Sequence, residues 1–257
     1  MNLPHTLDRR VTIQAPRETV FSFFTDSARW ASWWGPGSTV EPRVGGRVYI
    51  RHPGNVESSG EVLEIKPPAT FAFSYGFNSG SPFPPGGSRV TISLEPSGGA
   101  TLLSLHHEFP DGVSRDHHVQ GWRFQLSLFA NAVADLVNSG AASAVDAWFE
   151  LWKETDDAAR LATLGRIAAA DVVFRDRYSL IDGATELSAH VAAAQKFMPG
   201  VVLQRRGGVR HCQGTVIADW TATGPDQAPR GQGSNVFVFG PDGRITAVTG
   251  FWGGASA

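Results

Sequence analysis

The stretch RVTISLEPSGGATLLSLHHEF, residues 89–109, decides the fold of the first half of the chain. It holds two apolar runs separated by a Ser-Gly-Gly turn. Runs of this kind, bounded by turn-forming residues, indicate neighbouring antiparallel strands. In the second run, a period of two places Leu105 and His107 on one face and His106 on the other. The stretch therefore predicts part of an antiparallel meander, with one face toward a core.

The same strand pattern continues toward the N-terminus. Further strands are expected at 9–15, 44–52, 60–65 and 70–77. The segment 16–35 instead carries apolar residues at helical spacing and breaks near Asp26. Pro16 suits the first turn of a helix, where its missing N–H costs nothing. This segment predicts two short helices.

Toward the C-terminus, residues 117–140 carry apolar side chains at alternating steps of three and four. These residues are Val119, Trp122, Leu126, Phe129, Val133 and Leu136. The spacing predicts a long amphipathic helix that ends near Gly140.

A second domain is expected after this helix. The small and polar stretch NSGAASA, residues 138–144, is typical of a linker. A chain of 257 residues is long enough for two domains, which we expect at 1–139 and 140–257. Three helical patterns follow, at 145–152, 161–167 and 183–200. Strands are expected at 171–176, 201–211, 214–224, 233–240 and 244–252. Helices and strands in both halves indicate an α+β fold class.

Composition excludes several partners and sites. A net charge of -2 gives no electrostatic reason to expect nucleic acid or an anionic membrane, and no apolar stretch is long enough to span a bilayer. The lone cysteine, Cys212, permits neither an internal disulfide nor a CxxC-type zinc site, so we expect a cytoplasmic protein without a metal. No GxGxxG, GxxxxGK[ST] or GxSxG pattern is present, and no cofactor is expected.

The first half resembles the Aha1-like (activator of Hsp90 ATPase homologue) branch of the START/SRPBCC superfamily. The resemblance is carried by APRETVFSFFTDSARWASWWGP, VGGRVYI, GEVLEIKPPATFAFSY and the opening stretch followed by Gly121 and Trp122. It covers most of residues 8–138 and implies a helix-grip fold, in which a curved sheet wraps a long helix around a cavity. It implies no particular reaction.

The second half resembles the SnoaL-like part of the NTF2-like superfamily. ADVVFRDRYSLIDG resembles the family's first strand and turn, and SNVFVFGPDGRITAVTGFWG its last two strands. The resemblance implies three helices against a bent sheet with a pocket at the wide end, and pairing of two copies through the open sheet. A homodimer through this domain is therefore a hypothesis.

Ketosteroid isomerase shares this implied scaffold. By that resemblance, Asp176 stands where the isomerase carries its carboxylate base, and Asn235 where it carries a protonated acid in the oxyanion hole. Trp152 stands in place of the isomerase's oxyanion tyrosine. An indole N–H is a weaker donor with a different reach, so this departure argues against isomerase chemistry as such.

Candidate ligand-binding residues of the first domain lie on inward strand faces or in aromatic clusters. They are Trp34, His52, Tyr75, His107 and Trp122. Together they suit an aromatic cavity with a few polar tips, which would take a flat or hydrophobic molecule. The alternative is that the rings fill the core and that His107 is a core histidine with hydrogen-bond partners. Both interpretations remain open.

In the second domain Asp176 is the main catalytic candidate. A carboxylate at an apolar pocket mouth can shuttle a proton, with Tyr178 and Asn235 as donors to a carbonyl or enolate oxygen. The alternative for Asp176 is a turn aspartate paired with Arg175 or Arg177. Trp152, His190, His211 and Trp220 are candidate ligand-binding residues.

These candidates favour two classes of function. One is binding, and acid/base conversion of an isomerase, cyclase or hydrolase type, of a small hydrophobic carbonyl-bearing or aromatic metabolite, in the manner of polyketide cyclase-like proteins. The other is a non-catalytic ligand-binding or stress-response module. Regulation of Hsp90 rests on the family name alone.

Overall fold

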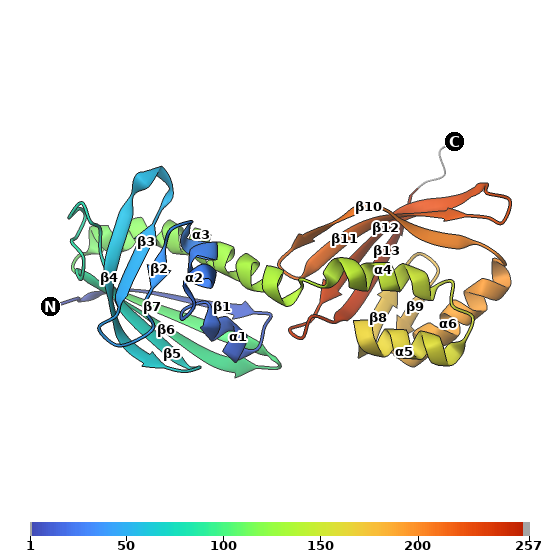
Figure 1. Ribbon diagram of the computed structural model, residues 1–257, viewed down its shortest axis with the longest axis horizontal. Coiled ribbons are helices and arrows are strands. Elements are labelled where there is room, and N and C mark those ends of the chain that lie inside the picture. The colour runs from blue at the N-terminus through green and yellow to red at the C-terminus, as the bar shows by residue number, and fades with distance from the viewer. Residues whose placement is uncertain (1, 254–257) are drawn as a thin grey trace. The chain divides into compact units, whose positions relative to one another are not determined.

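The computed structural model describes residues 2–253, so the outermost ends of the two expected domains lie outside it. The chain divides into two compact units, Met1–Ala134 and Asp135–Ala257. Within the described residues one sheet has seven strands and the other has six, and helices accompany both (Figure 1). The predicted α+β class is confirmed. The division of the chain between residues 139 and 140 into domains of two different families stays a prediction.

The first unit is an antiparallel meander with a long helix. Its elements are β1 (His5–Ile13), α1 (Arg17–Ser22), α2 (Ser27–Trp34), β2 (Thr39–Val40), β3 (Arg47–Arg51), a 3-10 turn (Pro53–Asn55), β4 (Glu57–Lys66), β5 (Thr70–Tyr75), β6 (Ser88–Ser97), β7 (Ala100–Phe109) and α3 (Gly112–Val137). The strand order is β1-β7-β6-β5-β4-β3-β2. The register of β6 and β7 closes at Ser97 opposite Ala100, so the predicted strand pair is confirmed.

Helix α3 packs an aromatic face into this unit. The ring of Phe129 lies 5.1 Å from that of Phe24 and 5.0 Å from that of Trp33, centroid to centroid. The sequence prediction was wrong at the N-terminal end of the helix, and it placed Leu136 on the buried face. The helix begins earlier, where Asp111 accepts a hydrogen bond from the Ser114 amide (2.8 Å) as an N-cap residue does. Near its C-terminal end, Leu136 is 40% exposed instead of buried.

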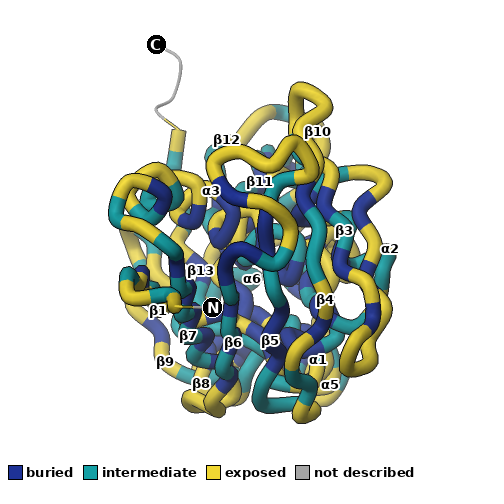
Figure 2. Tube along the Cα trace, turned by 90° about the vertical axis from the view of Figure 1, so that its left-hand side faces the viewer, coloured by how far each residue is buried: buried dark blue, intermediate teal, exposed yellow. Residues whose placement is uncertain are grey.

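The second unit packs three helices with a mixed sheet. Its elements are α4 (Ala141–Leu151), α5 (Asp157–Ile167), β8 (Ala168–Arg175), β9 (Leu180–Asp182), α6 (Ala184–Phe197), β10 (Val202–Cys212), β11 (Thr215–Thr223), β12 (Pro229–Phe239) and β13 (Ile245–Trp252). The strand order is β10-β11-β12-β13-β8-β9, antiparallel except for the parallel pair of β13 and β8. Exposed residues gather at the loops of the chain, while buried residues recur along its strands (Figure 2).

The predicted linker at 138–144 was wrong in its second half, because α4 already begins at Ala141. The reason is that Ala is the strongest helix former, and three of the four residues from 141 to 144 are Ala. Strand β9 was not predicted. It is three residues long, too short to show a period.

Polar side chains tie the three helices of the second unit together. The buried Arg160 of α5 donates to Ser188 Oγ of α6 (3.2 Å) and to the carbonyl of Glu154 (2.7 Å). From α6, Gln195 Nε2 donates to the carbonyls of Trp152 (3.0 Å) and Glu154 (2.9 Å), just after α4. The position of α6 is therefore fixed by hydrogen bonds as well as by apolar packing.

Within residues 2–253 no helix combines the length and the apolar character needed to cross a bilayer.

Candidate functional site

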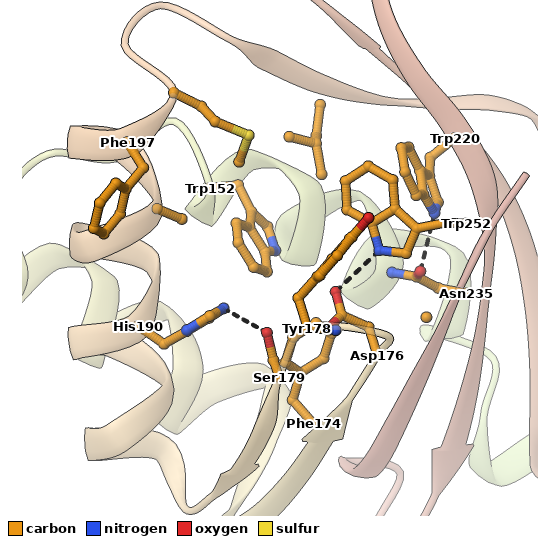
Figure 3. A pocket seen from close by; sticks show the side chains of 14 residues that line it. Trp152, Phe174, Asp176, Tyr178, Ser179, His190, Phe197, Trp220, Asn235 and Trp252 are labelled. Carbon is orange, nitrogen blue, oxygen red and sulfur yellow. Dashed lines mark hydrogen bonds between the residues drawn. The ribbon is translucent and has the colours of Figure 1, made fainter. Parts of the chain in front are cut away.

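A cavity of about 480 Å³ lies in the second unit, a size that suits a small organic ligand (Figure 3). Its walls come from all strands of the unit's sheet except β9, from the end of α4, from the turn after β8 and from α6. The lining residues are Trp152, Phe174, Asp176, Tyr178, Ser179, His190, Ala194, Phe197, Met198, Leu203, Trp220, Asn235, Gly250 and Trp252. Most of this surface is apolar, with a few polar groups.

The sheet register brings Asp176 and Asn235 to either side of Gly250. Asn235 is paired with Gly250 across β12 and β13, and Asp176 follows Arg175, which is paired with the neighbouring Thr249. A Cβ atom on Gly250 would lie 3.1 Å from Asp176 Cβ and 3.2 Å from Asn235 Oδ1. A glycine at this position therefore lets the carboxylate and the amide approach each other.

Two donors hold the Asp176 carboxylate. Trp252 Nε1 donates to Oδ2 (3.2 Å), and the backbone N–H of Tyr178 donates to Oδ1 (2.8 Å). The backbone N–H of Asp176 also donates to the Ser179 carbonyl (3.0 Å), which closes a tight turn. Asp176 thus combines the features of a turn aspartate with a place in the cavity wall. A carboxylate has about four acceptor positions, so these two bonds leave room for a ligand.

The orientation of the Asn235 amide follows from its partner. Trp220 Nε1 lies 3.0 Å from Asn235 Oδ1, and an indole N–H can only donate, so the carbonyl oxygen accepts this bond. The NH₂ group is then left for the cavity, on the side where Asp176 lies (Figure 3). Asn235 is 7% exposed, which makes its amide a buried neutral donor.

Trp152 offers a second donor. Its Nε1 is buried and makes no hydrogen bond, and Figure 3 shows this nitrogen on the edge of the ring that faces Tyr178 and Asp176. An N–H removed from water without a partner costs free energy that an accepting ligand atom would recover. The indole N–H is therefore a buried, unpaired donor that belongs to a residue of the cavity wall.

His190 and Ser179 form a further polar pair in the wall. His190 Nε2 lies 3.2 Å from Ser179 Oγ, joining α6 to the turn after β8. The imidazole also lies against the rings of Trp152 and Phe174, both at 6.0 Å between centroids. The pair thus sits between aromatic surfaces.

The mouth of the cavity is lined by exposed apolar side chains. Tyr178 is 70% exposed and Phe197 is 86% exposed, and Met198 follows at the end of α6. The Tyr178 ring stands edge-on to that of Trp252 at 5.5 Å, under the guanidinium of Arg177. An apolar rim of this kind favours entry of an apolar ligand.

The candidate residues of the first unit meet in a different cluster, centred on His107. Trp122 Nε1 donates to His107 Nδ1 (2.8 Å), so the proton of the neutral ring is on Nε2, which donates to Ser88 Oγ (2.9 Å). Ser88 in turn donates to the Tyr75 carbonyl (2.9 Å). Burial holds the pKa of His107 well below its ordinary value. Both ring nitrogens have partners, as expected for a core histidine.

Tyr75, His52 and Trp34 lie beside this chain of hydrogen bonds. Ser58 Oγ donates to the Tyr75 hydroxyl (3.2 Å) and lies 3.1 Å from His52 Nε2. Burial raises the pKa of Tyr75 to about 12 and lowers the pKa of His52. The Trp34 ring stands edge-on to His52 at 5.8 Å, and its buried Nε1 makes no hydrogen bond. These residues contact one another as core residues do.

His211 lies apart from both groups. Its Nδ1 is 2.9 Å from Asp135 Oδ1, and its Nε2 accepts from the Gly214 amide (3.0 Å). The structure therefore does not bring His211 to the cavity with the other candidates of the second half.

Sequence reasoning missed several residues of the cavity wall, chiefly Trp252, Ser179 and Gly250. The alternation of β13 could have signalled Trp252 and Gly250, since both share a face with the buried Val248. Nothing local to Ser179 marks its bond to His190. Within residues 2–253, no group of three or more His, Cys, Asp or Glu side chains is arranged to hold a metal ion.

Comparisons with known proteins now bear on both units. The family model of the activator of Hsp90 ATPase homolog 1-like protein matches residues 14–134. That segment is similar to Aha1-like proteins. The match covers most of the first unit, and it supports the resemblance seen in the sequence there. None of the curated proteins matches the chain.

Solved structures similar to the chain include representatives of both expected families. A SnoaL-like protein from Agrobacterium tumefaciens is 23% identical, covers 44% of this chain and 96% of its own, and has a TM-score of 0.42. CalU16 from Micromonospora echinospora is 26% identical over 50% of this chain and 76% of its own, with a TM-score of 0.42. The Aha1 dimer from Colwellia psychrerythraea is 19% identical over 48% and 92%, with a TM-score of 0.41.

Proposed function

We propose that the second unit binds a flat, mainly apolar molecule with a carbonyl group, and that Asp176 moves a proton of this molecule. The observation that carries the proposal is the pairing of a carboxylate acceptor with a buried amide donor across Gly250, inside an apolar cavity. Acid/base chemistry on a carbonyl compound needs both groups at short range.

The reaction uses only side chains of the chain. Asp176 removes a proton from the carbon next to the carbonyl, and negative charge develops on the carbonyl oxygen. The Asn235 NH₂ and the unpartnered Trp152 Nε1–H supply donors for that oxygen. Return of the proton to another carbon would isomerise the ligand, whereas attack of the enolate on a second carbonyl would close a ring. Both outcomes fit an isomerase or cyclase type of enzyme.

Proton exchange tests the proposal without knowledge of the natural ligand. The probe is 2-tetralone, a flat apolar ketone with acidic α-protons, followed by NMR in D₂O. Wild-type protein should accelerate exchange, and Asp176→Asn should lower the accelerated rate by about 10²–10⁴-fold. Asp171→Asn is the control, because Asp171 is an exposed residue of β8, the strand that leads into Asp176, and does not line the cavity.

The same experiment separates the alternatives. Exchange that persists in Asp176→Asn would remove Asp176 from the mechanism and leave it the role of a turn residue. Saturable binding of the ketone to wild-type protein with no exchange would instead favour the non-catalytic ligand-binding module.

We also propose that two copies of the protein pair through the sheet of the second unit. The apolar side chains of Val238 in β12 and Phe251 in β13 are 41% and 57% exposed. Along β12, Val238 alternates with the buried Phe237 and Phe239, so its side chain points to the opposite face of the sheet. We expect a dimer mass in size-exclusion chromatography with light scattering, and Phe251→Glu should shift it to a monomer mass. A monomer mass for the wild-type protein would refute the dimer.

A further inference from the structure

We infer that Ser179 and His190 form a second proton-transfer group in the cavity, and that the ligand is a carbonyl compound with a hydroxyl group on its β-carbon. This inference rests on the proposed role of Asp176 and extends it from one proton-handling group to two.

One turn carries Asp176 and Ser179. The bond from the Asp176 amide to the Ser179 carbonyl (3.0 Å) closes the turn, and the bond from the Tyr178 amide to Asp176 Oδ1 (2.8 Å) fixes its first side chain. Both residues line the cavity. The carboxylate and the hydroxyl are therefore presented to the same cavity by a single hydrogen-bonded turn.

His190 reaches Ser179 from α6. Its Nε2 lies within hydrogen-bond distance of Ser179 Oγ, at 3.2 Å. The helix is held on both sides of His190: Ser188 bonds to Arg160 and to Asp157 Oδ1 (2.6 Å), and Gln195 bonds to the chain after α4. Such support is what keeps an acid/base group in a fixed geometry.

The cavity contains few other groups that can exchange protons. Among its lining residues the titratable side chains are Asp176, Tyr178 and His190, and Tyr178 stands at the exposed mouth. Around His190 the wall is formed by the rings of Trp152 and Phe174. A ligand that fills the cavity is thus met by a carboxylate and by a hydroxyl–imidazole pair at separate points.

Two separate groups suit a reaction in which one atom loses a proton and another gains one. Movement of a proton between two carbons needs only one carboxylate. Loss of water from a β-hydroxy carbonyl compound needs a base at the α-carbon and an acid at the hydroxyl oxygen. The Ser179–His190 pair is therefore assigned to the β-hydroxyl group of the ligand.

The elimination balances as follows. Asp176 takes the α-proton, and the electrons of the C–H bond form the carbon–carbon double bond through the enolate. The bond from the β-carbon to oxygen breaks, and the oxygen leaves as water with a proton from Ser179. The protonated imidazole of His190 returns a proton to Ser179 Oγ and becomes neutral. The products are an α,β-unsaturated carbonyl compound and water. The proton on Asp176 returns to His190 through solvent, so no oxidant or reductant is required.

The test compares elimination with α-proton exchange. The elimination probe is 4-hydroxy-4-phenylbutan-2-one, whose conjugated product absorbs in the near ultraviolet, and the exchange probe is 2-tetralone. Asp176→Asn should abolish both activities. Ser179→Ala and His190→Gln should lower elimination by about 10²-fold, and at least tenfold more than they lower exchange. Ser179→Thr, which keeps the hydroxyl, should restore most of the elimination.

A matched histidine completes the test. His211→Gln is the control and should leave both rates unchanged, because His211 lies away from the cavity.

The outcomes distinguish the inference from the function on which it rests. Exchange by wild-type protein without elimination, or elimination at the wild-type rate in both Ser179→Ala and His190→Gln, would overturn the second proton-transfer group. If the wild-type protein catalyses neither exchange nor elimination, the proposed function itself is overturned.

Discussion

At the scale of single residues, Trp152 shows how a buried donor can report a ligand. Its Nε1 has no partner, whereas the indoles of Trp220 and Trp252 donate to Asn235 and Asp176. A donor that satisfied the fold alone would be paired, as the great majority of buried polar groups are. Trp34 and Trp148 also carry unpaired indole N–H groups, and of the three only Trp152 lines this cavity. Its place in the cavity wall therefore singles it out as a donor to test.

Trp152→Phe should weaken binding of 2-tetralone by about tenfold, which corresponds to about 1.4 kcal/mol, because the carbonyl loses one donor. Calorimetric titration measures the effect. Trp148→Phe is the control: the Nε1 of Trp148 is also buried and unpaired, but Trp148 does not line the cavity. Equal losses of affinity in the two variants would contradict the role given to Trp152.

Gly250 sets the approach of Asp176 to Asn235. In Gly250→Ala the added methyl group would have to displace the carboxylate or the amide by a few tenths of an ångström. Small misplacements of catalytic groups are costly, so proton exchange should fall by about 10–100-fold. The exchange assay on 2-tetralone measures this loss.

Gly165→Ala provides the matched control. Gly165 is an exposed residue of α5, and a Cβ there meets no atom within 4 Å. We expect unchanged exchange and a gain in stability of about 0.5–1 kcal/mol, since Ala is the better helix former. An exchange rate in Gly250→Ala equal to that of Gly165→Ala would show that the spacing is not critical.

At the scale of helices and strands, one arginine joins α5 to α6. Arg160 is 2% exposed and binds Ser188, the Glu154 carbonyl and Asp157 Oδ1 (3.1 Å). Its planar guanidinium reaches partners in three directions at once, which neither Lys nor an apolar side chain can do. The cavity depends on this joint because α6 carries His190.

Arg160→Met should lower the stability of the second unit by about 1–3 kcal/mol, because Ser188 and the Glu154 carbonyl lose a buried donor. Hydrogen exchange followed by mass spectrometry should show faster exchange in α5 and α6. Arg123→Met, on the exposed side of α3, serves as the control and should change neither helix. Unchanged protection of α6 in Arg160→Met would mean that apolar packing alone holds the helix.

At the scale of the whole molecule, the stability of the first unit should depend on pH. Burial lowers the pKa of His52, His107 and His118, and all three lie in the first unit. Histidines of the unfolded chain titrate near 6.5, so below that pH the unfolded state takes up protons that the folded unit does not. Stability from these residues is complete above about pH 6.5 and is lost as pH falls toward their lowered pKa values.

We therefore expect the first unit to lose protection against hydrogen exchange between about pH 7.5 and pH 5.5, after correction for intrinsic exchange rates. For one fully buried imidazole such as His107, the loss is at most about 1.4 kcal/mol per pH unit. Peptides from β5, β6 and β7 report on the effect, and His118→Gln should reduce it. Constant protection of these strands over that range would falsify the prediction.

Local patterns in the sequence determined most helices and strands. Apolar residues at every second position predicted β7 and placed His106 and His107 on opposite faces. Apolar residues at steps of three and four predicted the buried face of α3. These patterns succeed because one side of each element must face the core, whatever lies beyond it. The resemblance to SnoaL-like proteins pointed to Asp176 and Asn235, which the structure places along one cavity, and their roles stay predictions.

Only the tertiary structure decided which of these side chains meet. Asp176 meets Trp252 and Ser179 meets His190 because of the parallel pairing of β13 with β8 and the docking of α6, which join residues far apart in the chain. Trp122 and Ser88 pair with both nitrogens of the buried His107, and His211 lies against Asp135 and not in the cavity wall. A periodic pattern fixes the face of a residue but not its partner, since the partner depends on register and on packing between distant elements.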